Sequence, residues 1–441
     1  MAAAAERLSI VSSFAQGPGY KALVCIFLGG GNDANNMIVP LAGYSAYSGV
    51  RASSGLAIAD TTLLPITPAS LGVDFGLHPS LAAVHPLFGS KRLAVVCNVG
   101  PLVQPLTKSQ YLGGFPRPYQ LFSHADQIAQ WQTSVSNSVG QTGWGGRIAD
   151  TFGPGPAGFP FITALAGGVY TRGLSSSPLT VAAAPTALNQ TLVLSGFGTA
   201  ADEKARLNSM NYLRTVDLMD NLVYAADKTT QQALNISAAL NVDPVLTTVF
   251  PNTTLGNQLK QVAKIMKLNQ TSAALGLNRQ IFFCSLGGFD THQNQVSTQA
   301  SLLTQLGNAM KAFYDCTIEL GLESGVTTFT LSDFSRTFQP SGTGVGTVGT
   351  DHAWGSHHLV MGGSVFGGDF YGVKGANNTV FPTLQLAGPD DADNRGRWIP
   401  TTSVDQYGAT LAQWLGVSPS SIPAVFPNIG AFDNPNLGFL I

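Results

Sequence analysis

Residues 21–33, which read KALVCIFLGGGND, join a continuous apolar run to a glycine turn that ends in an aspartate. An uninterrupted apolar run of this length is typical of a strand buried on both faces, as in a parallel sheet. Three further runs repeat the pattern: RLAVVCNV (92–99), RQIFFCSL (279–286) and VTTFTLS (326–332). These four segments predict the strands of one central sheet.

Helical patterns lie between the predicted strands. The clearest covers residues 299–320, where apolar side chains recur at steps of four and three and therefore share one face. It separates two predicted strands, which is the βαβ arrangement of a parallel sheet. The sequence thus predicts an α/β fold, with a mostly parallel sheet flanked by helices. We expect residues 21–441 to form a single domain with a cap inserted at about 153–278, which contains helices at 201–240 and 255–268.

The composition of the chain excludes several classes of function. Its 441 residues carry 22 basic and 24 acidic side chains, a formal net charge of −2, without the basic run that nucleic-acid binding requires. No apolar run is long enough to span a bilayer. Four cysteines are expected to be buried as small hydrophobic side chains, although one disulfide fits the sequence as well.

The first 20 residues differ in character from the rest. They are rich in alanine, include a short apolar stretch, and resemble the tail of a signal peptide whose basic front is missing. We expect either such a remnant, which implies export, or an N-terminal arm.

Imidazole and carboxylate side chains gather in three short segments that also contain Gly, Ser or Thr. These are GGFDTH (287–292), LSDFSRT (331–337) and TDHAWGSHH (350–358). Such side chains are ligands for Zn²⁺ or Mn²⁺. In α/β sheets ligands bind beyond the carboxyl ends of the strands, and Asp33, Asp290 and Asp333 each follow a predicted strand. The sequence therefore predicts a site for one or two divalent metal ions. The candidate ligands are Asp33, Asp290, His292, Asp333, Asp351, His352, His357 and His358.

Several candidates have a structural alternative. Asp33 is equally suited to cap the next helix. Consecutive extended residues face opposite ways, so only one of His357 and His358 is expected to reach the ion. Arg336 lies three residues beyond Asp333 and either binds an anionic substrate or neutralises that carboxylate.

Ser123 and His124 place a hydroxyl beside an imidazole. A neighbouring metal ion would lower the pKa of the hydroxyl and make it a nucleophile. The segment lacks the Gly-x-Ser-x-Gly elbow of common esterases, and a helix cap at Ser123 is the alternative. The predicted catalytic residues are Ser123, His124 and Arg336.

The ordered set GGND, SHADQ, TGWGGR, GGFDTH, LSDFSRT and TDHAWGSHH resembles the DUF1501 family, whose members are bacterial and usually exported by the twin-arginine route. That family is placed in the alkaline phosphatase and sulfatase superfamily. The resemblance implies an alkaline-phosphatase-like core with a metal site at the carboxyl end of the sheet. It also implies that Asp33 binds metal and that Ser123 is the nucleophile.

The chain departs from its relatives in two places. The Asp-His pair of the superfamily is Ser332-Asp333 here, and the Cys-x-Pro-x-Arg signature of sulfatases is absent. We expect an exported, periplasmic or secreted, metal-dependent hydrolase that acts on a phosphate or sulfate ester, either a small molecule or part of a polymer. The alternatives are a non-catalytic metal-bearing binding protein of the cell envelope and a redox enzyme with copper or iron. The oligomeric state is open.

Overall fold

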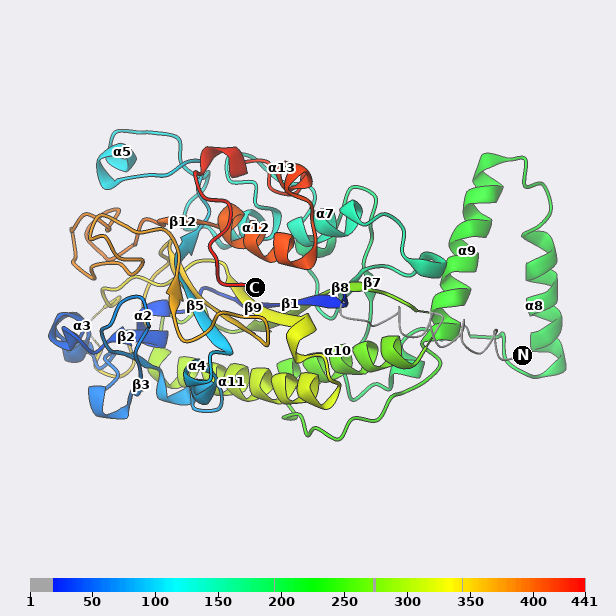
Figure 1. The fold of residues 1–441 in the computed structure, drawn as a ribbon, viewed down its shortest axis with the longest axis horizontal. Helices are drawn as coiled ribbons and strands as arrows, with labels where there is room; N and C mark the ends of the chain where they lie inside the picture. The colour runs from blue at the N-terminus through cyan, green and yellow to red at the C-terminus, as the bar shows by residue number, and fades with distance from the viewer. Residues whose placement is uncertain (1–18, 194, 273–274, 343, 441) are drawn as a thin grey trace.

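A computed structural model describes residues 19–193, 195–272, 275–342 and 344–440. Figure 1 shows a central sheet with helices on both faces. Within the described residues the main sheet has nine strands, in the order β11-β5-β10-β9-β1-β8-β6-β7, and β12 pairs with β5. Their bounds are β1 Lys21–Gly29, β5 Leu93–Gly100, β6 Ile162–Ala164, β7 Leu179–Thr180, β8 Arg279–Gly287, β9 Val326–Ser332, β10 Ser356–Gly362, β11 Phe370–Tyr371 and β12 Thr402–Ser403.

The four predicted strands are confirmed as β1, β5, β8 and β9. β1 lies at the centre of the sheet and pairs in parallel with both β8 and β9. Its seven inner residues are fully buried, which explains the unbroken apolar run. β10 runs antiparallel to β5 and β9, so the sheet is mostly rather than wholly parallel. The predicted α/β class is therefore confirmed.

Two helical layers cover the sheet (Figure 1). One contains α10 (Thr254–Thr271) and α11 (Gln295–Glu319), and the other contains α7 (Trp144–Thr151) and α12 (Val404–Leu415). α11 is the helix predicted at 299–320, but it begins four residues earlier. Near its start Gln295 and Gln299 are polar yet buried, because both hydrogen-bond to Asp33, which follows β1.

The region predicted as a cap is only partly separate from the core. Its strands β6 and β7 extend the main sheet, and α10 packs on α11. The predicted helix at 201–240 is two helices, α8 (Ala201–Leu213) and α9 (Asn221–Ala239). They project from the body as a hairpin, at the opposite end of the molecule from α2 (Ala34–Met37), which follows β1 (Figure 1). The limits of the cap stay a prediction.

A small antiparallel sheet, β2-β4-β3, follows α2. Its strands are β2 Ile38–Pro40, β3 Leu64–Ile66 and β4 Phe75–Leu77. The remaining α-helices are α3 Tyr44–Arg51, α4 His85–Gly89, α5 Lys108–Leu112, α6 His124–Thr133 and α13 Ile422–Val425. All four cysteines are free and buried, as expected.

None of the helices in the described ranges has the length and apolar character that a membrane span requires. The predicted signal-peptide remnant or arm, residues 1–20, lies outside the described residues except for its last two.

Candidate metal centre

Three strand ends meet at the carboxyl edge of the sheet. β1 ends in a turn in which Gly30 and Gly31 have φ angles of +112° and +84°. A Cβ atom at Gly30 would collide with the backbone of Asp290, so glycine permits the loops after β1 and β8 to touch. The backbone N–H of Gly30 also donates to the Oδ1 atom of Asp333, 3.1 Å away, after β9. The segments flagged in the sequence therefore converge at one edge.

Three histidines surround the carboxylate of Asp290. The Nε2 atoms of His124, His292 and His352 lie 3.4, 3.0 and 3.4 Å from its Oδ1 atom. The Nε2 atoms of His292 and His352 are 3.0 Å apart. One ligand atom from each of His124, Asp290 and His352 lies within 4.8 Å of the others. We call these four residues the histidine cluster.

The other ring nitrogen of each histidine contacts an oxygen that can only accept. The Nδ1 atom of His124 lies 2.7 Å from Oδ2 of Asp333, and that of His292 lies 3.2 Å from Oδ1 of Asp351. The Nδ1 atom of His352 lies 2.8 Å from the carbonyl oxygen of Phe122. A neutral imidazole that donates from Nδ1 has its lone pair at Nε2. In this tautomer all three Nε2 atoms, which lie within 3.4 Å of Oδ1 of Asp290, are free to accept.

This donor set fits a divalent metal ion. The group whose ligand atoms all lie within 4.8 Å of one another offers two imidazole nitrogens, from His124 and His352, and one carboxylate oxygen, from Asp290, and these suit Zn²⁺ or Mn²⁺. His292 lies beside this group, with its Nε2 atom 3.0 Å from that of His352. Oxygen acceptors behind metal-binding histidines are the usual means of fixing the ring and its tautomer. The Nε2 atom of His124 is buried and has no hydrogen-bond partner among the described residues, which is what a ligand atom requires. In this geometry Asp333 and Asp351 orient histidines instead of facing the centre.

Electrostatics favour the binding forms of two cluster residues. Burial raises the pKa of Asp290, but the hydrogen bond and charge of Arg336, together with His292 and His124, outweigh it and hold this pKa below its usual value. Burial lowers the pKa of His352, which keeps the ring neutral. His124 differs, since the hydrogen bond to Asp333 raises its pKa. A proton therefore competes with an ion for His124 more strongly than for His352.

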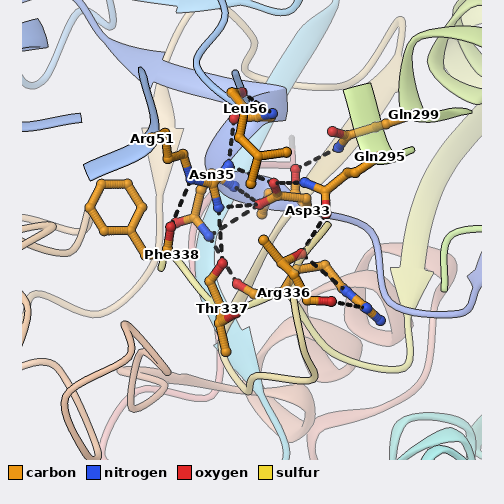
Figure 2. Close-up of polar contacts among 12 residues, drawn as sticks. Asp33, Asn35, Arg51, Leu56, Gln295, Gln299, Arg336, Thr337 and Phe338 are labelled. Atoms are coloured by element: carbon orange, nitrogen blue, oxygen red, sulfur yellow. Dashed lines mark hydrogen bonds and ion pairs between the residues drawn. The ribbon is translucent and has the colours of Figure 1, made fainter. Parts of the chain in front are cut away.

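Asp33 lies in a buried network of polar side chains that includes Arg51 and Gln295 (Figure 2). Its Oδ2 atom accepts hydrogen bonds from Arg51 at 2.6 Å and from Gln295 at 2.5 Å. Its Oδ1 atom accepts from the backbone of Asn35, as the cap of α2. Neither Asp33 nor Arg51 is exposed to solvent. The structure thus gives Asp33 the capping role and an ion pair, and does not bring it into the cluster.

The same network reaches the cluster through Arg336. The Oε1 atom of Gln295 accepts from Thr350, whose hydroxyl and carbonyl oxygens in turn accept from Arg336. Arg336 is fully buried and its Nη1 atom donates to Oδ1 of Asp290 at 2.7 Å. Its ion-pair partner is Asp290, not Asp333, and its guanidinium holds the central carboxylate in place.

His357 and His358 lie on β10, which is buried throughout. The side chain of His357 stacks on Phe381, whereas that of His358 packs against Trp131 and Tyr407, so the two face opposite sides as the alternation requires. Burial lowers the pKa of both to about 3. Neither belongs to the histidine cluster.

Ser123 precedes α6 but does not cap it with its side chain. Its hydroxyl donates to Oδ2 of Asp126 at 2.6 Å. The residues on either side both reach the cluster, since the Phe122 carbonyl accepts from His352 and His124 is a member. Ser123 is thus held in the chain between two cluster contacts.

The sequence reasoning missed two arginines at the rim. Arg395 donates from Nη2 to Oδ2 of Asp351 at 2.5 Å, and Arg397 donates from Nε to the carbonyl oxygen of His352 at 2.9 Å. The guanidinium of Arg397 also lies 4.4 Å from the centroid of the Phe122 ring. Both come from the loop DDADNRGRW (390–398). Only 10% of the residues in the chain are charged. The high density of charged residues in this loop could therefore have marked it as part of the site.

Comparisons with known proteins give distant structural likenesses. A 2-O GAG sulfatase, BT1596, is 9% identical with a TM-score of 0.32, and the match covers 92% of this chain and 74% of that one. Ps i-CgsB, solved in complex with k-i-k-neocarrahexaose, is also 9% identical with a TM-score of 0.34, covering 94% and 77%. Likenesses at these TM-scores define neither a shared fold nor a shared activity. No curated protein matches the chain.

The family comparison covers most of the chain. A family described as "Protein of unknown function (DUF1501)" matches residues 20–377. This span includes every member of the histidine cluster, together with Ser123, Asp333 and Arg336, and it ends before the loop that holds Arg395 and Arg397. The chain belongs to the DUF1501 family.

Proposed function

We propose that this protein is a metal-dependent hydrolase of phosphate or sulfate esters. The observation that supports this most is the convergence of three Nε2 atoms on the carboxylate of Asp290, each ring held from behind by an oxygen acceptor. A divalent ion bound there would polarise an ester oxygen and stabilise the charge that develops during displacement.

The chain supplies the other parts that such a reaction needs. Asp290 is partly open to solvent, with 45% of its side chain exposed, so a substrate can reach the cluster. Arg395 lies beside Asp351 at the rim and supplies positive charge for a phosphate or sulfate group. Arg336 is buried and committed to Asp290, so it positions that carboxylate rather than binding the anion.

Ser123 is our candidate nucleophile. In the proposed step the Oγ atom attacks phosphorus or sulfur as the bond to the ester oxygen breaks, and the proton of Oγ passes through Asp126 to the departing oxygen, which leaves as the alcohol. A water molecule then releases the phosphate or sulfate from Ser123 and returns the proton to its hydroxyl. The 2.6 Å hydrogen bond from Ser123 to Asp126 provides the route for that proton. A water molecule is the competing nucleophile.

The test uses the full chain loaded with Zn²⁺ or Mn²⁺ and a panel of aryl phosphates and sulfates. We expect turnover that Ser123→Ala reduces at least about a hundredfold while the bound metal is unchanged. Ser138→Ala, a change at an exposed serine, is the matched control. Full activity of Ser123→Ala would assign the attack to water, and absence of turnover by the metal-loaded protein would reject the hydrolase.

The same donor set supports a second candidate function. Imidazole and carboxylate ligands also suit iron, and imidazole suits copper, so a redox enzyme fits the cluster chemically. Elemental analysis of protein purified from its natural host separates the two, because zinc supports hydrolysis and copper supports redox chemistry. Bound metal without turnover of either kind would favour a binding protein of the cell envelope.

We further propose that the protein is exported to the periplasm or secreted. The composition of residues 1–20 and the resemblance to exported DUF1501 proteins support this. Fractionation of cells that express the full natural gene tests it, and recovery in the cytoplasm alone would reject it.

A further inference from the structure

The turn that leads into α6 has an unusual backbone. The N–H of Ser123 donates to the carbonyl oxygen of Gln120 at 3.2 Å, which closes a four-residue turn. Its third residue, Phe122, has a φ angle of +72°, in the left-handed region. Glycine is the usual residue at the third position of a turn with positive φ, because a side chain makes this conformation unfavourable. Contacts with other parts of the chain must therefore hold Phe122 in place.

Three contacts hold Phe122 in this conformation. Its backbone N–H donates to Oε1 of Gln127 at 2.9 Å, and its carbonyl oxygen lies 2.8 Å from Nδ1 of His352. The centre of its ring lies 4.4 Å from the guanidinium of Arg397. Both backbone polar groups and the side chain of Phe122 are thus engaged, which is how a strained conformation persists.

Gln127 is fully buried near the start of α6. Its backbone N–H donates to the carbonyl oxygen of Ser123 at 2.9 Å, while its side chain accepts from Phe122. Gln127 therefore holds the residues on both sides of the Phe122–Ser123 peptide bond. Among the described residues the Nε2 atom of Gln127 has no hydrogen-bond partner, so its side chain is committed to Phe122.

The carbonyl oxygen of Phe122 fixes how His352 meets the histidine cluster. The ring of His352 stacks on that of Phe334, with the centroids 4.8 Å apart, and this packing is nearly the same after the imidazole rotates by half a turn. Such a rotation would put a carbon atom where Nε2 now lies, 3.4 Å from Oδ1 of Asp290. The hydrogen bond from Nδ1 to the carbonyl oxygen of Phe122 therefore selects the orientation that presents Nε2.

We propose that Gln127 is a positioning residue of the metal centre. By holding the N–H of Phe122, it keeps that residue in the left-handed conformation. This conformation aims the carbonyl oxygen of Phe122 at His352 and sets the backbone from which Ser123 projects. The part of the proposal that concerns His352 needs only a metal centre, whereas the part that concerns Ser123 rests on the proposed hydrolase.

Binding of Zn²⁺ to the full chain tests the proposal. Gln127→Met keeps the size of the side chain but removes the acceptor, so we expect Zn²⁺ affinity to fall about tenfold in titrations against a chelator. Gln127→Glu retains an oxygen acceptor and should bind Zn²⁺ more tightly than Gln127→Met. Native affinity in Gln127→Met would overturn the proposal.

Gln130→Met is the matched control. Gln130 is also fully buried in α6, and its side chain donates at 2.7 Å to the carbonyl oxygen of Tyr119, in the same loop, instead of to Phe122. Gln130→Met should lower stability in urea unfolding as Gln127→Met does, yet keep native Zn²⁺ affinity. Equal losses of affinity in the two variants would reveal a general loosening of α6 and reject the positioning role.

Two substitutions at Phe122 test the left-handed conformation itself. Phe122→Gly and Phe122→Val both remove the ring that packs on Arg397, but only glycine adopts a positive φ without strain. We expect Phe122→Gly to bind Zn²⁺ several-fold more tightly than Phe122→Val. Equal affinities would mean that the conformation of Phe122 does not orient His352, contrary to the proposal.

A measurement on the metal-free chain separates this proposal from the proposed hydrolase. NMR of protein labelled at the ring nitrogens of histidine reports which nitrogen carries the proton, and His352→Ala identifies the signals of His352. We expect a single form protonated at Nδ1 in the native protein and a mixture of forms in Gln127→Met. Unchanged His352 signals in Gln127→Met would reject the positioning role even if the native protein hydrolyses esters. A protein without turnover would lose only the part of the proposal that concerns Ser123.

Discussion

The Nδ1 atom of His124 lies 2.7 Å from the Oδ2 atom of Asp333, although the two residues are 209 positions apart in the chain. The other carboxylate oxygen of Asp333 accepts from the backbone of Gly30. Asp333 therefore ties α6 to the turn after β1, and it turns the Nε2 atom of His124 toward Asp290.

This contact predicts that Asp333→Asn weakens metal binding but does not abolish it. The amide oxygen can still accept the hydrogen bond, but it carries no charge and supports the imidazole less strongly. We expect metal affinity to fall about 10- to 100-fold, the usual effect of removing a partner behind a ligand. Titration against a chelator measures it. His124→Ala should lose far more affinity, and equal losses in the two variants would make Asp333 a ligand itself.

The number of bound ions is a second prediction. Within the described residues one group of candidate ligands converges, while Asp33, His357 and His358 are engaged elsewhere. We therefore expect one ion per chain by elemental analysis. His352→Ala should reduce this to a small fraction, whereas His85→Ala, at a histidine whose ring contacts the Pro65 carbonyl, should leave it unchanged. Two ions per chain would require ligands outside the cluster.

Asp33→Ala should destabilise the fold more than it disturbs metal binding. The substitution leaves the guanidinium of Arg51 buried with no carboxylate opposite, which costs about 3–5 kcal/mol. Urea unfolding measures the loss. Asp60→Ala, at an exposed carboxylate, should change stability by less than about 0.5 kcal/mol. A variant at Asp33 that keeps its stability but loses its metal would restore Asp33 as a ligand.

Asp405 makes stability depend on pH. Burial raises its pKa from the usual 3.8 to about 7, and its carboxylate has no hydrogen-bond partner among the described residues. The folded state therefore holds the proton more tightly than the unfolded state. Its contribution to stability is complete below about pH 4 and is lost as the pH rises through 7.

Asp405→Asn mimics the protonated form and removes that dependence. The stability of the variant relative to the native protein should grow by about 3 kcal/mol between pH 5 and pH 8. Denaturant unfolding at the two pH values measures this difference. Parallel pH dependence in the two proteins would show that Asp405 is ionised in the fold at both values.

The strands were predictable because an unbroken apolar run is a local property. β10 was not, although it is buried throughout, because it begins with Ser356, His357 and His358 and so lacks an apolar start. Those histidines consequently looked like ligands when they are core residues. The order of strands, which puts β10 between β5 and β9, depends on contacts that no local pattern encodes.

The sequence predicted where the candidate site lies, but not which role each of its residues has. Asp33 and Asp290 both follow a central strand, and both were predicted as metal ligands, with a capping role as the alternative for Asp33. Their difference arises from Arg51 and Gln295, which reach Asp33 from α3 and α11. Arg395 was missed because it lies in an irregular loop, where neither strand nor helix periodicity points to an edge of the sheet.

The contacts behind the histidine rings also bear on when the site can form. The Nδ1 atom of His352 contacts the carbonyl oxygen of Phe122, 230 positions earlier in the chain. The contact between Asp333 and His124 joins residues that are similarly far apart. A ribosome-bound chain that stops before residue 352 lacks one of the three ligand atoms that lie together. Loading with metal must therefore follow synthesis of most of the polypeptide, and a truncated product is distinguished from the finished protein by its failure to retain the ion.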